Sequence, residues 1–173
     1  MCITKLFQKD LAGKQRYYFI HKGQHRAKRT PMQPRILSVK DKYLHYQVTV
    51  DKSWFYPSEF DVGWNKLPGL SSYRLHTNSA RVGWRCTGGK IRIASYCYVD
   101  GVRTTIEQLS LKKGDTLDVV IKQEQGDVLF TLNGVSYIQH GFTRNMDWLT
   151  HFYFGGTKPA PHHIEATIKF PKH

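Results

Sequence analysis

The chain has 173 residues, of which 40% are hydrophobic and 13% aromatic, a composition typical of a folded globular domain and not of a disordered chain. It has no apolar run as long as a membrane span, and its start, MCITKLFQKDLAGK, lacks the continuous apolar core of a secretory signal. We therefore expect synthesis in the cytoplasm. The odd count of three cysteines fits a reducing compartment.

The positive charge is concentrated near the start of the chain. Residues 1–40 hold ten lysines and arginines against one acid, Asp10, and so carry +9 of the net charge of +13. We predict a basic N-terminal arm over residues 1–40, whose alternating segment RYYFIHKG partly enters a sheet, and a β-domain over residues 41–173. Such an arm favours an anionic partner, although a solvated arm that only keeps the protein soluble has the same composition.

Strand patterns dominate the rest of the chain. Apolar and polar residues alternate over 42–50, 116–123, 127–134, 151–156 and 162–170, while 105–111 or 144–150 form at most a helical turn. The stretch 51–77, rich in Trp, Pro and Gly, reads as a long loop, and long loops in compact domains are often functional. Many short strands and no long helix predict an all-β fold, an antiparallel two-sheet β-sandwich or jelly roll.

Residues 78–100 form a predicted hairpin around a Gly-Gly turn. If Thr87 and Lys90 close the turn, Cys86 lies opposite Ile91, and the register continues outward. One face then carries the core residues Ala80, Val82, Trp84, Cys86, Ile91, Ile93, Ser95, Cys97 and Val99. The other face carries Ser79, Arg81, Gly83, Arg85, Arg92, Ala94, Tyr96 and Tyr98. This register separates Cys86 from Cys97 by about 20 Å, too far for a disulfide.

The polar face of this hairpin has an unusual composition for a sheet surface. Arg85 lies opposite Arg92, and like charges directly opposite each other are destabilising. This pair therefore needs an anion or a nearby carboxylate. Ordinary surface roles remain the alternative: Tyr96 and Tyr98 would be strand residues of high β-propensity. Arg81 and Arg85 would pair with Asp61 or Glu59 at the sheet surface.

Three short motifs resemble a known family. KLPGL (66–70), Ser-x-Arg followed by Trp-Arg (79–85) and Tyr-x-Tyr (96–98) are similar to the central segment of polysaccharide lyases of the family 14 type, mainly over residues 60–103. The resemblance implies a concanavalin-like jelly roll and β-elimination on glucuronate-containing polymers. It also implies a catalytic set of Lys66, Ser79, Arg81, Tyr96 and Tyr98 on a concave sheet.

Further residues are candidates for contacts with a substrate. Arg85 and Arg92 add positive charge to the same face, Trp64 can stack on a sugar ring, and His45 lies on the polar side of the strand 42–50. The histidine pairs His21/His25 and His162/His163 have no accompanying cysteine pair, so we expect no metal site and no cofactor.

Three functions follow from these patterns. The first is a jelly-roll protein that binds an acidic polysaccharide or another polyanion, for example a surface or decoration component of a virion with a protein assembly partner. The second is a lyase that cleaves uronate-containing polymers. The third is a nucleic-acid-associated protein that uses residues 14–40, which would show a steep dependence of affinity on salt. No membrane-spanning role is expected.

Overall fold

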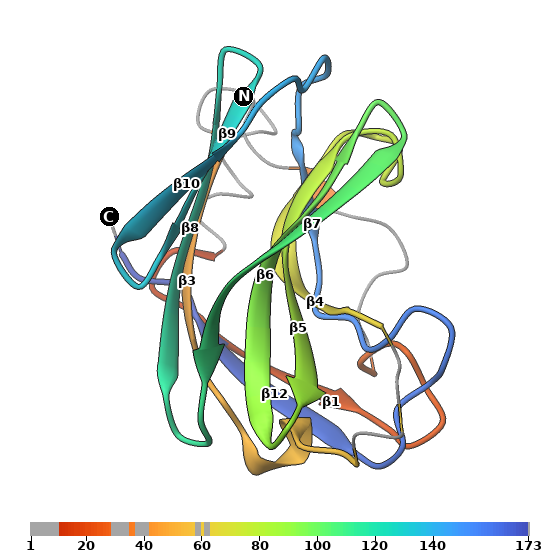
Figure 1. Ribbon diagram of the computed structural model, residues 1–173. Helices are drawn as coiled ribbons and strands as arrows, with labels where there is room; N and C mark the ends of the chain where they lie inside the picture. The colour runs from red at the N-terminus through yellow and green to blue at the C-terminus, as the bar shows by residue number, and fades with distance from the viewer. Residues whose placement is uncertain (1–10, 29–34, 37–41, 58–59, 61–62, 173) are drawn as a thin grey trace.

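Two six-stranded antiparallel sheets pack face to face in the computed structural model, which describes residues 11–28, 35–36, 42–57, 60 and 63–172 (Figure 1). The first sheet has the strand order β1 (Gln15–Ile20), β12 (Ile164–Lys169), β3 (Tyr43–Thr49), β8 (Thr116–Glu124), β9 (Asp127–Leu132), β10 (Val135–Gln139). The second has the order β2 (Arg35–Ile36), β11 (Trp148–Thr150), β4 (Asn65–Ser71), β5 (Ser79–Thr87), β6 (Lys90–Val99), β7 (Val102–Leu111). In the described residues the regular helical structure between these strands is one 3-10 turn, η1 (Lys52–Trp54). The prediction of an antiparallel two-sheet jelly roll is confirmed.

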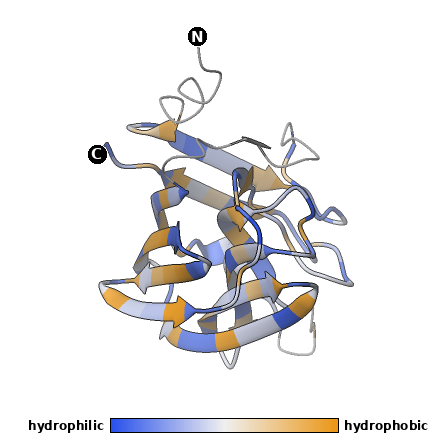
Figure 2. Cartoon of the chain, turned by 90° about the horizontal axis from the view of Figure 1, so that it is seen from above, coloured by the Kyte–Doolittle hydropathy of each residue, from blue (hydrophilic) through white to orange (hydrophobic). Residues whose placement is uncertain are grey.

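The core lies between the two sheets. Alternate residues point inward, so hydrophobic and hydrophilic residues succeed one another along the strands (Figure 2). Its centre is aromatic: the rings of Trp54 and Trp84 stack with centroids 4.4 Å apart, and Phe152 packs nearly parallel to Trp84 at 6.2 Å. This packing fixes the side of the second sheet that faces the first.

The predicted register of the β5–β6 hairpin is confirmed. Ser79 lies opposite Tyr98, Arg81 opposite Tyr96 and Cys86 opposite Ile91. The face that alternation assigned to the core is the one packed against the first sheet, with Trp84, Ile91 and Ile93 fully buried. Cys86 and Cys97 are both free thiols, six ladder positions apart. Cys2 lies outside the described residues.

Two sequence-based expectations about local structure are wrong. The segment 105–111 belongs to β7, because its backbone pairs along the whole length of β6 and its β-branched residues suit a strand. The stretch 51–77 contains the strand β4, which the Pro-Gly pair at 68–69 concealed. This strand tolerates Pro68 because a bulge between Lys66 and Gly69 interrupts its pairing with β5.

The end of the chain also differs in detail. The segment 151–156 was expected to be a strand, but the regular strand β11 lies just before it, at 148–150. Beyond β11, Tyr153 forms isolated bridges with Lys66 on one side and Arg26 on the other. After β11 ends, the chain therefore still runs beside β4, through the single bridge between Tyr153 and Lys66.

The basic arm contributes two described strands: β1, which pairs with β12 at the edge of the first sheet, and the two-residue β2, which pairs with β11 in the second. Leu11, just before β1, is buried in the core. Residues 1–10, 29–34 and 37–40 of the arm lie outside the described residues. The division of the chain at residue 40 stays a prediction.

Candidate functional site

The candidate site lies on the side of β4, β5, β6 and β7 that points away from the first sheet, here called the outer face. Directly opposed residues in a ladder point to the same side, so the register orders this face into rows. One row is Ser71, Ser79, Tyr98 and Arg103; the next is Gly69, Arg81, Tyr96 and Thr105; the third is Lys66, Gly83, Ala94 and Glu107. Four of the five residues expected to be catalytic come from two neighbouring strands, and Lys66 joins them from β4.

Arg81 lies at the centre of the outer face. Its side chain passes so close to β4 that a Cβ atom on Gly69 would lie 2.6 Å from Arg81 Cγ and 2.3 Å from the Ala80 carbonyl oxygen. Only glycine fits there. The guanidinium carbon stands 5.1 Å from the centroid of the Tyr96 ring, and the residue is 6% exposed.

The charge of Arg81 lacks an ionic partner among the described residues. No described carboxylate lies within ion-pair distance, and its buried Nε has no hydrogen-bond acceptor there. Burial lowers the pKa of Arg81, and the group still stays protonated because arginine starts so high. A buried cation without a counter-ion destabilises the folded state, so the stability of the fold does not explain an arginine at this position.

Lys66 is the second buried cation. The backbone bridge with Tyr153 holds it in place, and its Nζ donates a hydrogen bond to the Gly155 carbonyl at 3.1 Å. The same Nζ lies 5.0 Å from the Tyr96 ring centroid. Burial, and then the charges of Arg81 and Arg103, lower the pKa of Lys66 to about 8. Both the charged and the neutral amine are therefore accessible near neutral pH.

Two tyrosines and a histidine stand beside these cations. The rings of Tyr96 and Tyr98 meet edge to face at 5.9 Å, and His76 stacks on Tyr98 at 5.1 Å. Burial, followed by the hydrogen bond with Tyr98, raises the pKa of Tyr96, so that hydroxyl keeps its proton. Burial lowers the pKa of His76, and Arg81 and Lys66 add to this effect.

Three unsatisfied hydroxyl groups lie on the outer face near Arg81. Ser79 Oγ, Thr105 Oγ1 and Thr150 Oγ1 are buried without a hydrogen-bond partner among the described residues. All three belong to the two rows that contain Arg81 and Tyr98, because Thr150 lies opposite Gly69. Each such group costs about 1–3 kcal/mol unless a ligand or water satisfies it.

At the other end of the outer face the arginines have a carboxylate partner, although the buried Arg85 Nε has no hydrogen-bond partner among the described residues. Arg92 binds Glu107 at 3.2 Å, and Arg85 lies 3.8 Å from the other oxygen of the same carboxylate. The Arg85–Arg92 juxtaposition therefore has the nearby carboxylate that the sequence argument required. This carboxylate belongs to Glu107. Glu59 and Asp61 both lie outside the described residues. The Arg85 guanidinium also covers the Trp64 ring at 4.5 Å.

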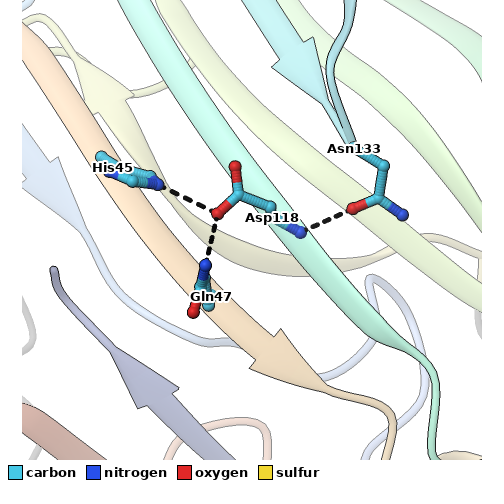
Figure 3. A network of polar contacts seen from close by, with 4 residues as sticks. All are labelled: His45, Gln47, Asp118 and Asn133. Atoms are coloured by element: carbon cyan, nitrogen blue, oxygen red, sulfur yellow. Dashed lines mark hydrogen bonds and ion pairs between the residues drawn. The ribbon is translucent and has the colours of Figure 1, made fainter.

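His45 is not part of this cluster. It lies on β3 in the first sheet, where Asp118 Oδ1 accepts hydrogen bonds from both His45 Nε2, at 3.0 Å, and Gln47 Nε2 (Figure 3). Asn133 joins this network by accepting from the Asp118 backbone N–H. The structure does not bring His45 together with the other eight candidates.

The structure adds neighbours that the sequence motifs did not mark. Arg103 and Thr105 come from β7, which the sequence did not identify as a strand. His76 lies in the loop before β5, and Tyr153 lies beyond β11. The pairing of β7 with β6 places Arg103 and Thr105, whereas the positions of His76 and Tyr153 depend on tertiary packing.

The described residues contain no group of three or more His, Cys, Asp or Glu side chains arranged to hold a metal ion. They also contain no helix long and apolar enough to cross a membrane.

Comparisons with known proteins identify the fold of this chain but no family to which it belongs. No family model and no curated protein matches the sequence. Among solved structures, an alginate lyase from Alteromonas sp. 272 superposes with a TM-score of 0.52 and 11% identity, over 76% of this chain and 70% of that one. A polysaccharide lyase of family 18 superposes with a TM-score of 0.53 and 10% identity, over 86% of this chain and 78% of that one.

The chain has the jelly-roll fold of these lyases. The resemblance that the motifs indicated, to a jelly-roll polysaccharide lyase, is therefore confirmed as a matter of fold. At such low identity the likeness carries no residue roles, because one scaffold hosts many functions.

Proposed function

We propose that the protein binds an acidic, uronate-containing glycan on the outer face, with Arg81 as the central contact. The observation that carries this proposal is the charge arrangement around Arg81. Arg81 and Lys66 are buried cations without a carboxylate partner among the described residues, and unsatisfied hydroxyls surround them. A uronate supplies both missing components, a carboxylate for the cations and hydroxyls for the orphaned polar atoms.

The aromatic residues support a sugar in preference to a simple anion. Tyr96 and Tyr98 form one wall beside Arg81, and Trp64 lies beyond Gly83, whose missing side chain leaves room for that ring. Sugar sites combine apolar ring surfaces with a few placed polar groups. The similar solved structures are lyases of such polymers, and we take alginate as the first polymer to test.

A second candidate function is β-elimination on the same glycan, and the lowered pKa of Lys66 favours it. Arg81 would neutralise the uronate carboxylate, and the neutral amine of Lys66 would take the C5 proton. The C4–O bond then breaks, a C4=C5 double bond forms, and the leaving oxygen takes a proton from Tyr96. The raised pKa of Tyr96 keeps that proton available.

The test is a panel of alginate, polyglucuronate and polygalacturonate, with a neutral glucan as control. Calorimetry measures binding, and the ultraviolet absorbance of unsaturated uronate measures cleavage. We expect binding to at least one uronate polymer and none to the glucan. Equal affinity for the glucan, or no binding to any polymer, contradicts the proposal.

The same panel separates binding from catalysis. Unsaturated product that is lost in Tyr96→Phe, with the affinity retained, would establish the lyase. Binding without product leaves a glycan-binding protein. A role in a virion and binding of nucleic acid through residues 14–40 stay predictions.

A further inference from the structure

A pair of aromatic side chains lies beside the proposed site, at the end of the row that contains Ser79 and Tyr98. Trp148 is the first residue of β11 and lies opposite Ser71, which in turn lies opposite Ser79. Opposed residues point to the same side of a sheet, and the next residue, Leu149, is buried in the core. Trp148 therefore stands on the same face as Arg81. It is two strands from Ser79, a separation of about 10 Å.

Tyr73 completes the pair from the loop between β4 and β5. Its ring meets the Trp148 ring at 5.7 Å with an interplanar angle of 64°, and its side chain is 73% exposed. The loop that presents it is compact. Ser72 Oγ donates to the Arg74 carbonyl at 3.0 Å, as does the Thr77 backbone N–H at 2.9 Å.

The loop between β4 and β5 contacts the row that contains Ser79 on both sides of that residue. Tyr73 packs on Trp148 of β11, while His76, three residues later, stacks on Tyr98 of β6. Asn78 ties the end of the loop to Asp100 with a hydrogen bond of 3.2 Å. The loop thus holds the aromatic pair at a fixed place relative to the proposed site.

Polar atoms connect the aromatic pair to Arg81. Thr150 Oγ1 and Ser79 Oγ lie in the neighbouring positions of the outer face, buried and without a hydrogen-bond partner among the described residues. Unsatisfied donors and acceptors between an exposed aromatic surface and a buried cation suit a ligand that carries hydroxyls along its length. A polysaccharide has that chemistry, whereas a single small anion does not.

We propose that Tyr73 and Trp148 form a second sugar subsite, which holds another ring of the glycan whose uronate carboxylate is bound at Arg81. This inference rests on the proposed function and adds the direction in which the bound glycan runs across the sheet. The glycan crosses the strands from β11 towards β6, with its hydroxyls over Thr150 and Ser79. The protein consequently prefers long oligosaccharides to short ones.

The experiment compares di- and hexasaccharides of mannuronate, glucuronate and galacturonate, with affinities measured by calorimetry. Tyr73→Ala should weaken hexasaccharide binding about five- to tenfold and change disaccharide binding less than twofold. Trp148→Leu, which keeps an apolar side chain on β11, should act in the same direction. Tyr17→Ala is the matched control, because Tyr17 is a similarly exposed tyrosine, at 60%, on β1 of the first sheet.

The outcomes distinguish this inference from the proposed function. Equal weakening at both lengths, or no change at either, overturns the second subsite while the anion site stands. Failure of the unmodified protein to bind any of the six oligosaccharides overturns the proposed function itself. The urea midpoint of each variant shows whether the fold is retained.

Discussion

Replacing Arg81 by methionine tests the central claim that this residue is held for a ligand at a cost to the fold. Methionine keeps the unbranched stem that packs beside Gly69 but removes the guanidinium. The substitution abolishes a buried cation with no described carboxylate partner, and with it an unsatisfied Nε. Most substitutions of a buried residue destabilise, so the expected sign here is unusual.

The magnitude follows from two opposing contributions. Removing the unsatisfied Nε should stabilise the folded state by about 1–3 kcal/mol. Removing the charge itself should stabilise it more, because an unpaired buried ion costs several kcal/mol. Loss of the contact with the Tyr96 ring costs about 2 kcal/mol at a desolvated site. The unsatisfied Nε is part of the cost of the buried ion, so the two gains overlap and are not added. Set against the loss, they should leave the free energy of unfolding unchanged or raised by about 1–3 kcal/mol.

Ligand binding should change in the opposite sense. A hydrogen bond to a charged group contributes about 1.5–3 kcal/mol, so Arg81→Met should weaken binding to the uronate polymer by roughly 10- to 100-fold. Urea unfolding followed by circular dichroism gives the stability, and calorimetry gives the affinity. Lys122→Met, on β8 of the first sheet, is the control because it removes one positive charge whose partner is Glu124.

One result would refute the reasoning. If Arg81→Met lost more than about 2 kcal/mol of stability and kept full affinity per folded molecule, Arg81 would be a structural residue. If Lys122→Met weakened binding as much as Arg81→Met does, net charge and not this site would govern the affinity.

Two further predictions concern the neighbours of Arg81. The pKa of Lys66 is lowered to about 8, so the unfolded chain binds more protons than the native one between pH 8 and the ordinary lysine pKa. The free energy of unfolding of the unmodified protein, minus that of Lys66→Met, should therefore rise by about 1–3 kcal/mol across that pH window. Urea titrations of both proteins at several pH values measure this difference. A difference that does not change with pH would refute the lowered pKa. The comparison between the two proteins is needed because the raised pKa of Cys97, about 12, acts in the opposite direction. Glu107→Gln should strengthen polyanion binding at low salt, because it releases Arg85 and Arg92, and should cost less than about 1 kcal/mol of stability since these pairs are half-exposed. Calorimetry at two salt concentrations checks this, and weaker binding would show that Glu107 itself contacts the ligand.

The sequence predicted those parts of the fold that depend on alternation. The β5–β6 hairpin is correct to the residue, because a tight turn and one apolar face leave a single register. The strand β4 was missed, because Pro68 and Gly69 are poor strand formers and only the bulge accommodates them. The edge strand β7 was missed for a different reason: much of it is exposed on both sides, so its apolar pattern is weak.

The same distinction applies to the candidate site. Ser79, Arg81, Tyr96 and Tyr98 could be grouped from sequence, because two adjacent strands carry all four. The sequence could not show whether each arginine has a carboxylate partner, because the partner of Arg85 and Arg92 comes from β7. Charge on a face is a property of a sequence pattern, whereas an unpaired charge is a property of the assembled sheet.

The four tryptophans are divided between the two sides of the second sheet, and this division has an optical consequence. Trp54 and Trp84 stack in the core, fully buried, while Trp64 and Trp148 stand half-buried at the outer face. The first pair emits from a dry environment that a soluble quencher cannot enter, whereas the second pair borders the proposed glycan path. The intrinsic fluorescence of the unlabelled protein therefore contains an internal reference and a reporter, which glycan occupancy should shield selectively from the quencher.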